Sequence, residues 1–176
     1  MTRSTRWLNA HERATWLKLV AVLELLPGVL DSQLRRDSGI THFEYYVLAM
    51  LSEAPERTLR MTELSQLTNA TLPRLSHVVR RLEERAVVER FPCPDDRRAT
   101  NARLTDVGWR LIQAAAPGHV ATVRENVLDA LTREQLAQLD AICAALLPRL
   151  DPERRLAGLY DPAARPEAGQ PHDKGR

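Results

Sequence analysis

The amino-acid sequence predicts a mainly α-helical fold with one small β-hairpin. Apolar residues recur at three- and four-residue spacing along stretches near both ends of the chain, which is the period of an α-helix. Near residue 87 this period gives way once to a β-branched run and a proline-punctuated turn. The chain has 176 residues, of which 44% are hydrophobic and 27% charged, as expected for a globular protein with a core.

The first predicted helix is long. Asn9 precedes Glu12 by three residues, a spacing that approximates a capping box. The apolar stripe that follows consists of Trp16, Leu19, Val20, Leu23, Leu26, Leu30 and Leu34. We expect one helix to about Arg36, ended by Ser38-Gly39, with a kink at Pro27.

The middle of the chain predicts three further helices. A second capping box, Thr41 to Glu44, opens a helix that ends near Glu53. The short segment at residues 59–61 is a candidate for a third strand. A short helix at 62–68 and a turn at 69–71 then lead to a helix at 72–85, whose apolar stripe is Leu72, Leu75, Val79 and Leu82.

The hairpin comes next. Residues 87–91 are expected to form one strand, the polar tip 92–96 cannot continue it, and residues 99–104 return as its partner. Thr105 then caps a helix to about Ala130, in which Pro117-Gly118 predicts a kink or a break. A third capping box at residues 132–135 opens a last helix, whose apolar residues are Leu136, Leu139, Ile142, Cys143, Leu146 and Leu147.

One helix carries a cationic face. Opposite the leucine stripe, the helix at 72–85 displays Arg74, Ser76, His77, Arg80 and Arg81, with Arg85 near its end. The fork of an arginine can pair with guanine in the major groove of DNA, and Arg85 suits a phosphate better than a base. A solvated amphipathic face is the alternative explanation, but no acid lies between Thr71 and Leu82. The net charge of +2 decides little, because the excess of arginine over lysine can be compositional.

The hairpin tip carries a second cationic group, Asp96-Arg97-Arg98. The narrow minor groove of DNA attracts arginine, and Asp96 is close enough in sequence to hold the Arg98 side chain. An ordinary charged turn is the alternative. Because a short helix, a turn and an amphipathic helix precede this hairpin, the whole predicts a winged helix-turn-helix that binds double-stranded DNA.

From about Leu34 to Leu150 the sequence resembles the MarR family of bacterial regulators. Residues 96–108 resemble the Asp-x-Arg wing tip of the family and its Leu-Thr-x-x-Gly sequence, and residues 60–64 and 79–85 match its helix-turn-helix. Ala86 departs from the pattern, because it stands where a glycine usually ends the recognition helix. A left-handed cap at alanine costs about 1 kcal/mol, so we expect that turn to close differently.

The resemblance implies a homodimer that represses transcription from a pseudo-palindromic operator. Arg74, Ser76 and His77 would then read bases, and Arg98 would enter the minor groove, oriented by Asp96. The implied segments are a dimerisation helix at 1–38, a DNA-binding lobe at 39–105, dimerisation helices at 106–150 and a tail at 151–176, for which the proline-rich composition predicts disorder. A small aromatic or amphipathic effector would bind near Trp16, His42, Tyr45, Tyr46 and Trp109, although core or dimer packing is the favoured explanation for each of these residues.

Other classes of protein are disfavoured. The five histidines form no catalytic pattern, no glycine-rich phosphate loop occurs, and the cysteines lack metal-ligand spacing, so we expect no enzyme, cofactor or metal. The sequence has no apolar run of membrane-spanning length and no signal peptide, which predicts a cytoplasmic protein. Two alternatives remain: a winged-helix module that binds proteins, and a redox switch at Cys93 if that thiol is exposed beside Arg97 and Arg98. Cys143 is expected to be a small core residue.

Overall fold

The computed structural model describes residues 5–94, 96 and 98–161. Its helices are α1 (Ala10–Ser38), α2 (His42–Glu53), α3 (Met61–Leu67), α4 (Leu72–Glu84), α5 (Asp106–Val123), α6 (Arg133–Leu150) and α7 (Ala157–Tyr160). Its strands are β1 (Thr58–Arg60), β2 (Val88–Pro92) and β3 (Thr100–Leu104). A 3-10 turn at Pro55–Arg57 precedes β1, and a π-helical turn at Arg124–Leu128 follows α5. The predicted fold class, mainly helical with a small hairpin, is confirmed.

The three predicted capping boxes are all formed. In each, the side chain of Asn9, Thr41 or Thr132 accepts the backbone N–H three residues on, and the side chain there accepts the N–H of the cap. The starts of α1, α2 and α6 were therefore predictable from local sequence. Neither Pro27 nor Pro117 interrupts its helix, so the break considered at Pro117-Gly118 is absent. The helix α5 instead ends at Val123 and passes into the π-helical turn.

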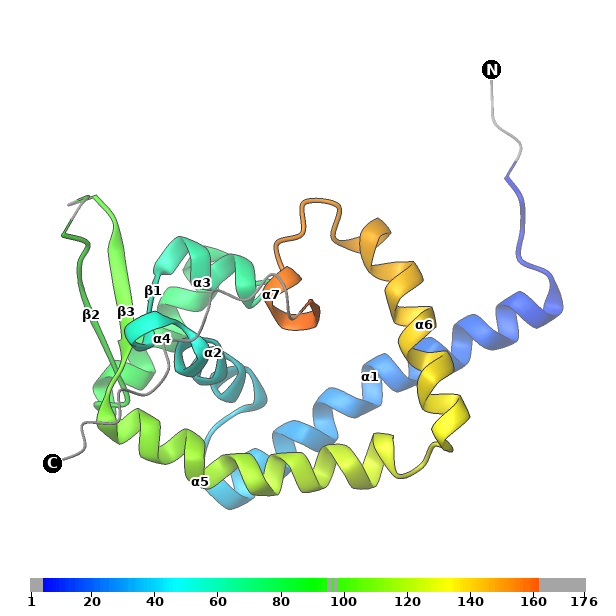
Figure 1. Cartoon of the computed structure of the whole chain (residues 1–176), viewed down its shortest axis with the longest axis horizontal. Helices are drawn as coiled ribbons and strands as arrows, with labels where there is room; N and C mark the ends of the chain where they lie inside the picture. The colour runs from blue at the N-terminus through cyan, green and yellow to red at the C-terminus, as the bar shows by residue number, and fades with distance from the viewer. Residues whose placement is uncertain (1–4, 95, 97, 162–176) are drawn as a thin grey trace, which may run out of the picture.

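The sheet has the order β1-β3-β2 and is antiparallel throughout, which confirms the third strand. The strands β2 and β3 pair from Val88↔Leu104 to Pro92↔Thr100 and form the projecting wing (Figure 1). The core lies between this sheet and helices α2 to α4. Its fully buried side chains are Leu34, Ile40, Val47, Leu48, Leu51, Leu64, Leu75, Val79, Leu82, Val88 and Ala102.

The turn from α4 into β2 closes in the left-handed conformation despite its alanine. Ala86 has φ 55°, its N–H donates to the Glu83 carbonyl at 2.8 Å, and the Val87 N–H donates to the Leu82 carbonyl at 2.9 Å. These two bonds make a complete Schellman motif, and Leu82 and Val87 supply its apolar contact in the core. The expectation that this turn closes differently is therefore wrong.

Residues 151–161 are ordered, which differs from the disorder expected for the tail. The carboxylate of Asp151 accepts the backbone N–H groups of Arg155 and Leu156 and the hydroxyl of Tyr160. These bonds fold the segment into a turn that leads to α7. The rest of the tail, residues 162–176, lies outside the described part of the chain.

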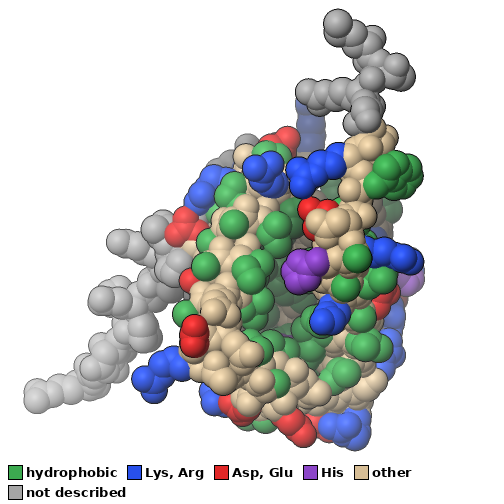
Figure 2. All heavy atoms as spheres, turned by 90° about the vertical axis from the view of Figure 1, so that its right-hand side faces the viewer, with side chains coloured by type: hydrophobic (Ala, Val, Ile, Leu, Met, Phe, Trp, Pro, Cys, Tyr) green, Lys and Arg blue, Asp and Glu red, His purple; other side chains and the backbone are tan. Residues whose placement is uncertain are grey.

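The long helices carry a large exposed apolar surface. The whole of α6 is exposed apart from the partly covered Leu147, and α1 exposes large apolar residues along its N-terminal two thirds. These residues are Trp16, Leu17, Leu19, Val22, Leu23, Leu25 and Val29 on α1 and Leu136, Leu139, Ile142, Leu146 and Leu150 on α6. In Figure 2, which faces this end of the molecule, hydrophobic side chains gather around a hollow. Cys143 is exposed on α6, so the prediction of a core cysteine fails for the single chain.

Candidate nucleic-acid interface

The helix α4 packs on the core by one face. Leu75, Val79 and Leu82 are fully buried, as their spacing predicts, whereas Leu72 is 42% exposed and does not extend that face. Because the helix has 3.6 residues per turn, its remaining residues fall on an outward face, a flank toward α2 and a flank toward β2.

The outward face carries His77 and Arg80, both exposed. The Arg80 guanidinium lies 3.2 Å from the Nδ1 atom of His77, and its Nε atom lies 3.9 Å from the Glu84 carboxylate. Because arginine is always a donor, this bond requires Nδ1 of His77 to accept, which leaves the N–H of the ring on Nε2. His77 therefore offers a donor to whatever lies against α4.

The flank toward α2 carries three of the predicted DNA-binding arginines. Arg74 stacks over the Phe43 ring at 4.3 Å, which orients its guanidinium and leaves the in-plane N–H donors accessible. Arg81 lies 3.5 Å from the carboxylate of Glu44, a residue only 2% exposed, and Arg85 donates to the Gly39 carbonyl at 3.3 Å. Arg81 and Arg85 thus tie α4 to the junction of α1 and α2.

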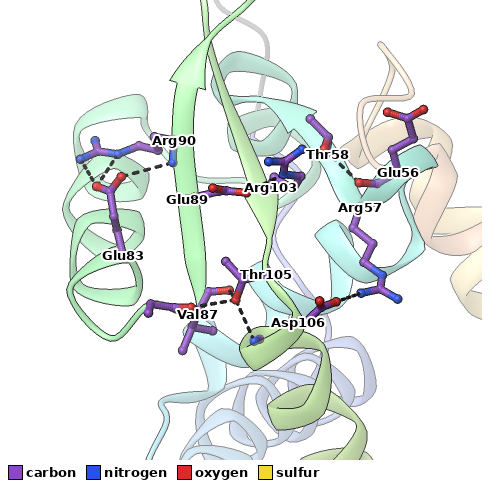
Figure 3. A network of polar contacts seen from close by, with 12 residues as sticks. Glu56, Arg57, Thr58, Glu83, Val87, Glu89, Arg90, Arg103, Thr105 and Asp106 are labelled. Carbon is purple, nitrogen blue, oxygen red and sulfur yellow. Dashed lines mark hydrogen bonds and ion pairs between the residues drawn. The ribbon is translucent and has the colours of Figure 1, made fainter.

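The flank toward β2 carries an ion pair that sequence reasoning missed. Glu83 accepts Nε and Nη2 of Arg90 at 3.0 and 2.6 Å and also the Arg90 backbone N–H at 3.2 Å, which joins α4 to the wing (Figure 3). These bonds hold the pKa of the Glu83 carboxyl below its ordinary value. Ser76, about two turns toward the N-terminus, is half-buried on the same flank.

The base of the wing is held by polar contacts on its other side. Arg103 of β3 bonds Glu89 of β2 at 2.6 Å, and Arg57 lies 3.3 Å from Asp106 at the start of α5 (Figure 3). The Thr105 hydroxyl donates to the Ala86 carbonyl at 2.7 Å and accepts the Gly108 N–H at 3.1 Å. These contacts fix the hairpin relative to α5.

The wing tip is a turn built on Asp96. Its carboxylate accepts the backbone N–H of Arg98 at 3.0 Å, rather than the guanidinium as expected from the sequence. Among the described residues no ion pair engages the exposed Arg98 side chain, and Arg97 lies outside them.

Cys93 is only 4% exposed. The exposure on which the redox-switch hypothesis depends is absent, so that hypothesis is wrong in its premise.

The candidate ligand residues fall in different places. His42 and Tyr45 of α2 meet His119 of α5, with ring centroids 6.0 Å (His42 to His119) and 4.4 Å (Tyr45 to His119) apart. Three others lie elsewhere: Trp16 is exposed on α1, the Tyr46 hydroxyl donates to the Leu67 carbonyl, and Trp109 stacks beneath Arg57.

His119 was not singled out from the sequence, because its neighbours come from another helix. Burial lowers the pKa of both His42 and His119, and the charge of His42 lowers the pKa of His119 further. Burial also raises the pKa of Tyr45. This cluster is therefore uncharged at neutral pH. The Nδ1 atom of His119 and the Oε1 atom of Gln33 are buried without a hydrogen-bond partner among the described residues.

The described part of the chain holds no helix that is both long and apolar enough to cross a membrane. It also holds no group of three or more histidine, cysteine or acidic side chains arranged to bind a metal ion.

Comparison with known proteins connects this geometry to a family. The family model described as MarR family matches residues 38–99. The HTH-type transcriptional regulator PrsX of Escherichia coli is 30% identical over 113 residues, which are 64% of this chain and 68% of PrsX. The transcriptional repressor MprA of Escherichia coli K12 is 24% identical over 120 residues, 68% of each chain.

Two solved structures of MarR family regulators are similar to this chain in both sequence and fold. Sco3205, a MarR family transcriptional regulator from Streptomyces coelicolor solved in complex with DNA, superposes with a TM-score of 0.81 at 43% identity, over 85% of this chain and 93% of Sco3205. AbsC, a MarR family regulator from the same organism, gives a TM-score of 0.78 at 36% identity, over 83% of this chain and 98% of AbsC. This chain therefore belongs to the MarR family of transcriptional regulators, as its resemblance predicted, and not to a class of enzymes.

Proposed function

We propose that the protein is a homodimeric repressor that binds a pseudo-palindromic operator, with α4 in the major groove and Arg98 of the wing in the minor groove. The observation that carries this proposal is the placement of cations. His77 and Arg80 project from the outward face of α4, Arg74 is oriented beside them, and Arg98 is exposed on the hairpin tip. The DNA complex of Sco3205, 43% identical to this chain, supports the same reading.

The exposed apolar faces of α1 and α6 support the dimer. Soluble monomers rarely expose contiguous apolar patches larger than a few hundred Å². A second copy of the chain is the occupant that places two lobes about one DNA turn apart, as a symmetric operator requires. Ile142, 56% exposed at the middle of α6, tests this arrangement. Ile142→Glu should yield monomers in sedimentation equilibrium, and an unchanged dimer would contradict the assignment of this face.

DNA binding is tested by selecting fragments from a random library and measuring affinity by fluorescence anisotropy. Arg98→Ala should weaken binding by about 1–3 kcal/mol, since it removes a charged contact. Arg133→Ala is the matched control, because Arg133 is an exposed arginine of α6, and this helix lies at the other end of the molecule from the wing (Figure 1). Equal losses in the two variants would contradict the wing assignment.

Arg74→Ala separates base reading from general attraction. Arg74 is held over Phe43 near the N-terminal end of α4, the part of a recognition helix that contacts base edges. The variant should select a broader set of sequences as well as bind more weakly. A protein that selects no DNA at any salt concentration would instead favour the alternative, a winged-helix module that binds another protein.

Repression and effector release complete the proposal. MprA, a relative, is named a transcriptional repressor, and binding over a promoter excludes polymerase. The expression of a reporter driven by the selected operator should therefore fall when the protein is present, and a rise would identify an activator.

For the effector we propose the His42, Tyr45 and His119 cluster, an uncharged site between α2 and α5 that suits a small aromatic or phenolic molecule. Phenol, which is uncharged at neutral pH as the site is, is a suitable first probe: it should release DNA from the wild type but not from Tyr45→Leu.

A further inference from the structure

A hollow of about 290 Å³ lies between the recognition helix and the wing. Its lining residues are Pro73, Ser76, His77, Arg80 and Arg90. Four come from α4 and one, Arg90, from β2, so the hollow exists only because the wing folds back beside the helix. The function proposed above uses His77 and Arg80 as general DNA contacts and gives Arg90 no role.

Every polar side chain that lines the hollow can donate a hydrogen bond. Arg90 has five N–H donors, and Glu83 engages two of them, on Nε and Nη2, which leaves three. The bond from Arg80 to Nδ1 of His77 leaves that ring with its proton on Nε2. Ser76 adds a hydroxyl. A hollow lined by two guanidinium groups, an imidazole N–H and a hydroxyl favours an anion with several hydrogen-bond acceptor oxygens. A phosphate group is such an anion.

The position of the hollow agrees with this chemistry. The major and minor grooves of B-DNA are separated by a sugar-phosphate strand. If α4 occupies one groove and the wing tip the next, that strand must pass between α4 and β2, over the hollow. The Glu83 carboxylate accepts both the Nε–H of the Arg90 guanidinium and the backbone N–H of Arg90. Because these bonds already fix the Arg90 side chain, little conformational entropy is lost when it binds a phosphate.

We propose that this hollow seats one DNA phosphate in each half-site, with Arg90 as its principal contact and Glu83 as the positioning residue for Arg90. The inference rests on the proposed function and refines it: Ser76, His77 and Arg80 turn toward the backbone between the grooves, which leaves Arg74 as the base-reading arginine of α4. The hollow thereby sets the register of the protein on its operator without adding sequence preference.

The test uses the full chain and its selected operator, in which single phosphates are replaced by neutral methylphosphonates. One replacement in each half-site should weaken the wild type by about tenfold or more, the value of a charged hydrogen bond. The same replacement should change the affinity of Arg90→Ala by less than about twofold, because that contact is already lost. Arg90→Ala should also flatten the dependence of log K on log salt by about 0.9, while selecting the same bases as the wild type.

Arg103→Ala is the matched control. Arg103 is also an arginine of the sheet paired with a glutamate, but its cross-strand partner is Glu89, on the face opposite Arg90 because side chains alternate along a strand. This variant should remain sensitive to the neutralised phosphate. His77→Ala provides a second variant in the hollow, exposed enough to spare the fold, and it should lose sensitivity to the same phosphate as Arg90→Ala.

The outcomes separate the two proposals. If the wild type selects no DNA, the proposed function itself fails. If the wild type selects an operator but no phosphate couples to Arg90, the phosphate seat is refuted and the proposed function stands. A change in the preferred base at one position in Arg90→Ala would likewise refute the seat, since it would make Arg90 a base-reading residue.

Discussion

Ala86→Gly should stabilise the protein. Ala86 adopts φ 55° at the end of α4, where its methyl group is exposed and its N–H is part of the Schellman motif. A left-handed conformation costs a non-glycine residue roughly 1–2 kcal/mol. Glycine avoids this cost but loses about 0.5–1 kcal/mol more backbone entropy on folding. Little buried surface is removed, so the free energy of unfolding should rise by about 0.5–1 kcal/mol.

The assay is urea unfolding followed by circular dichroism, at equal protein concentrations because a dimer's apparent stability depends on concentration. The matched control is Ala114→Gly, the same chemical change at an exposed site inside α5. There glycine should destabilise by about 0.5–1 kcal/mol. The two variants should therefore move in opposite directions. If both destabilise by similar amounts, Ala86 is not strained and the reasoning on this turn is refuted.

Three further predictions concern the lobe and its junction with α5. Gly108→Ala should destabilise by about 1–3 kcal/mol in the same unfolding assay, because its Cβ would lie 2.2 Å from the Val87 carbonyl oxygen; an unchanged midpoint would show that α5 can shift freely. Arg81→Ala should cost about 1–3 kcal/mol because it removes the guanidinium that lies 3.5 Å from the buried Glu44 carboxylate, and a loss no larger than that of Arg80→Ala would contradict this role. Since the pKa values of His42 and His119 lie below their ordinary 6.5, the unfolded state binds more protons, and stability should fall as the pH drops through 6.5 toward those lowered values. His119→Gln should flatten that fall, and an identical pH profile would argue that His119 does not titrate in this range.

Local signals were predictable from sequence, and contacts between elements were not. The capping boxes at Asn9, Thr41 and Thr132 involve residues three apart, so their pattern alone fixes where α1, α2 and α6 begin. The wing strands were likewise marked by a change of period and by prolines. The Schellman turn at Ala86 was discounted because alanine disfavours it, but packing of Leu82 and Val87 in the core outweighs that cost.

The candidate site shows the same division. A helical wheel places Arg74, Arg80 and Arg81 on one polar face, but it does not say that Phe43 and Glu44 lie along one flank of α4. Arg90 carried no sequence signal, since its role depends on Glu83 from another element. Cys93 lies beside prolines in a polar tip, and only the fold of the turn shows that its side chain is buried.

The most direct test of the central claim is the salt dependence of binding to the DNA that the protein selects, measured with wild type and Arg98→Ala together with the stoichiometry. We expect two chains per pseudo-palindromic site and a linear fall of log K with log salt, with a slope of about −0.9 for each phosphate contacted. Arg98→Ala should bind more weakly at every salt concentration. Three results would contradict the claim that a dimer binds the operator through both grooves. They are binding that does not respond to salt, a single chain per site, and an Arg98→Ala variant with the affinity and salt slope of the wild type.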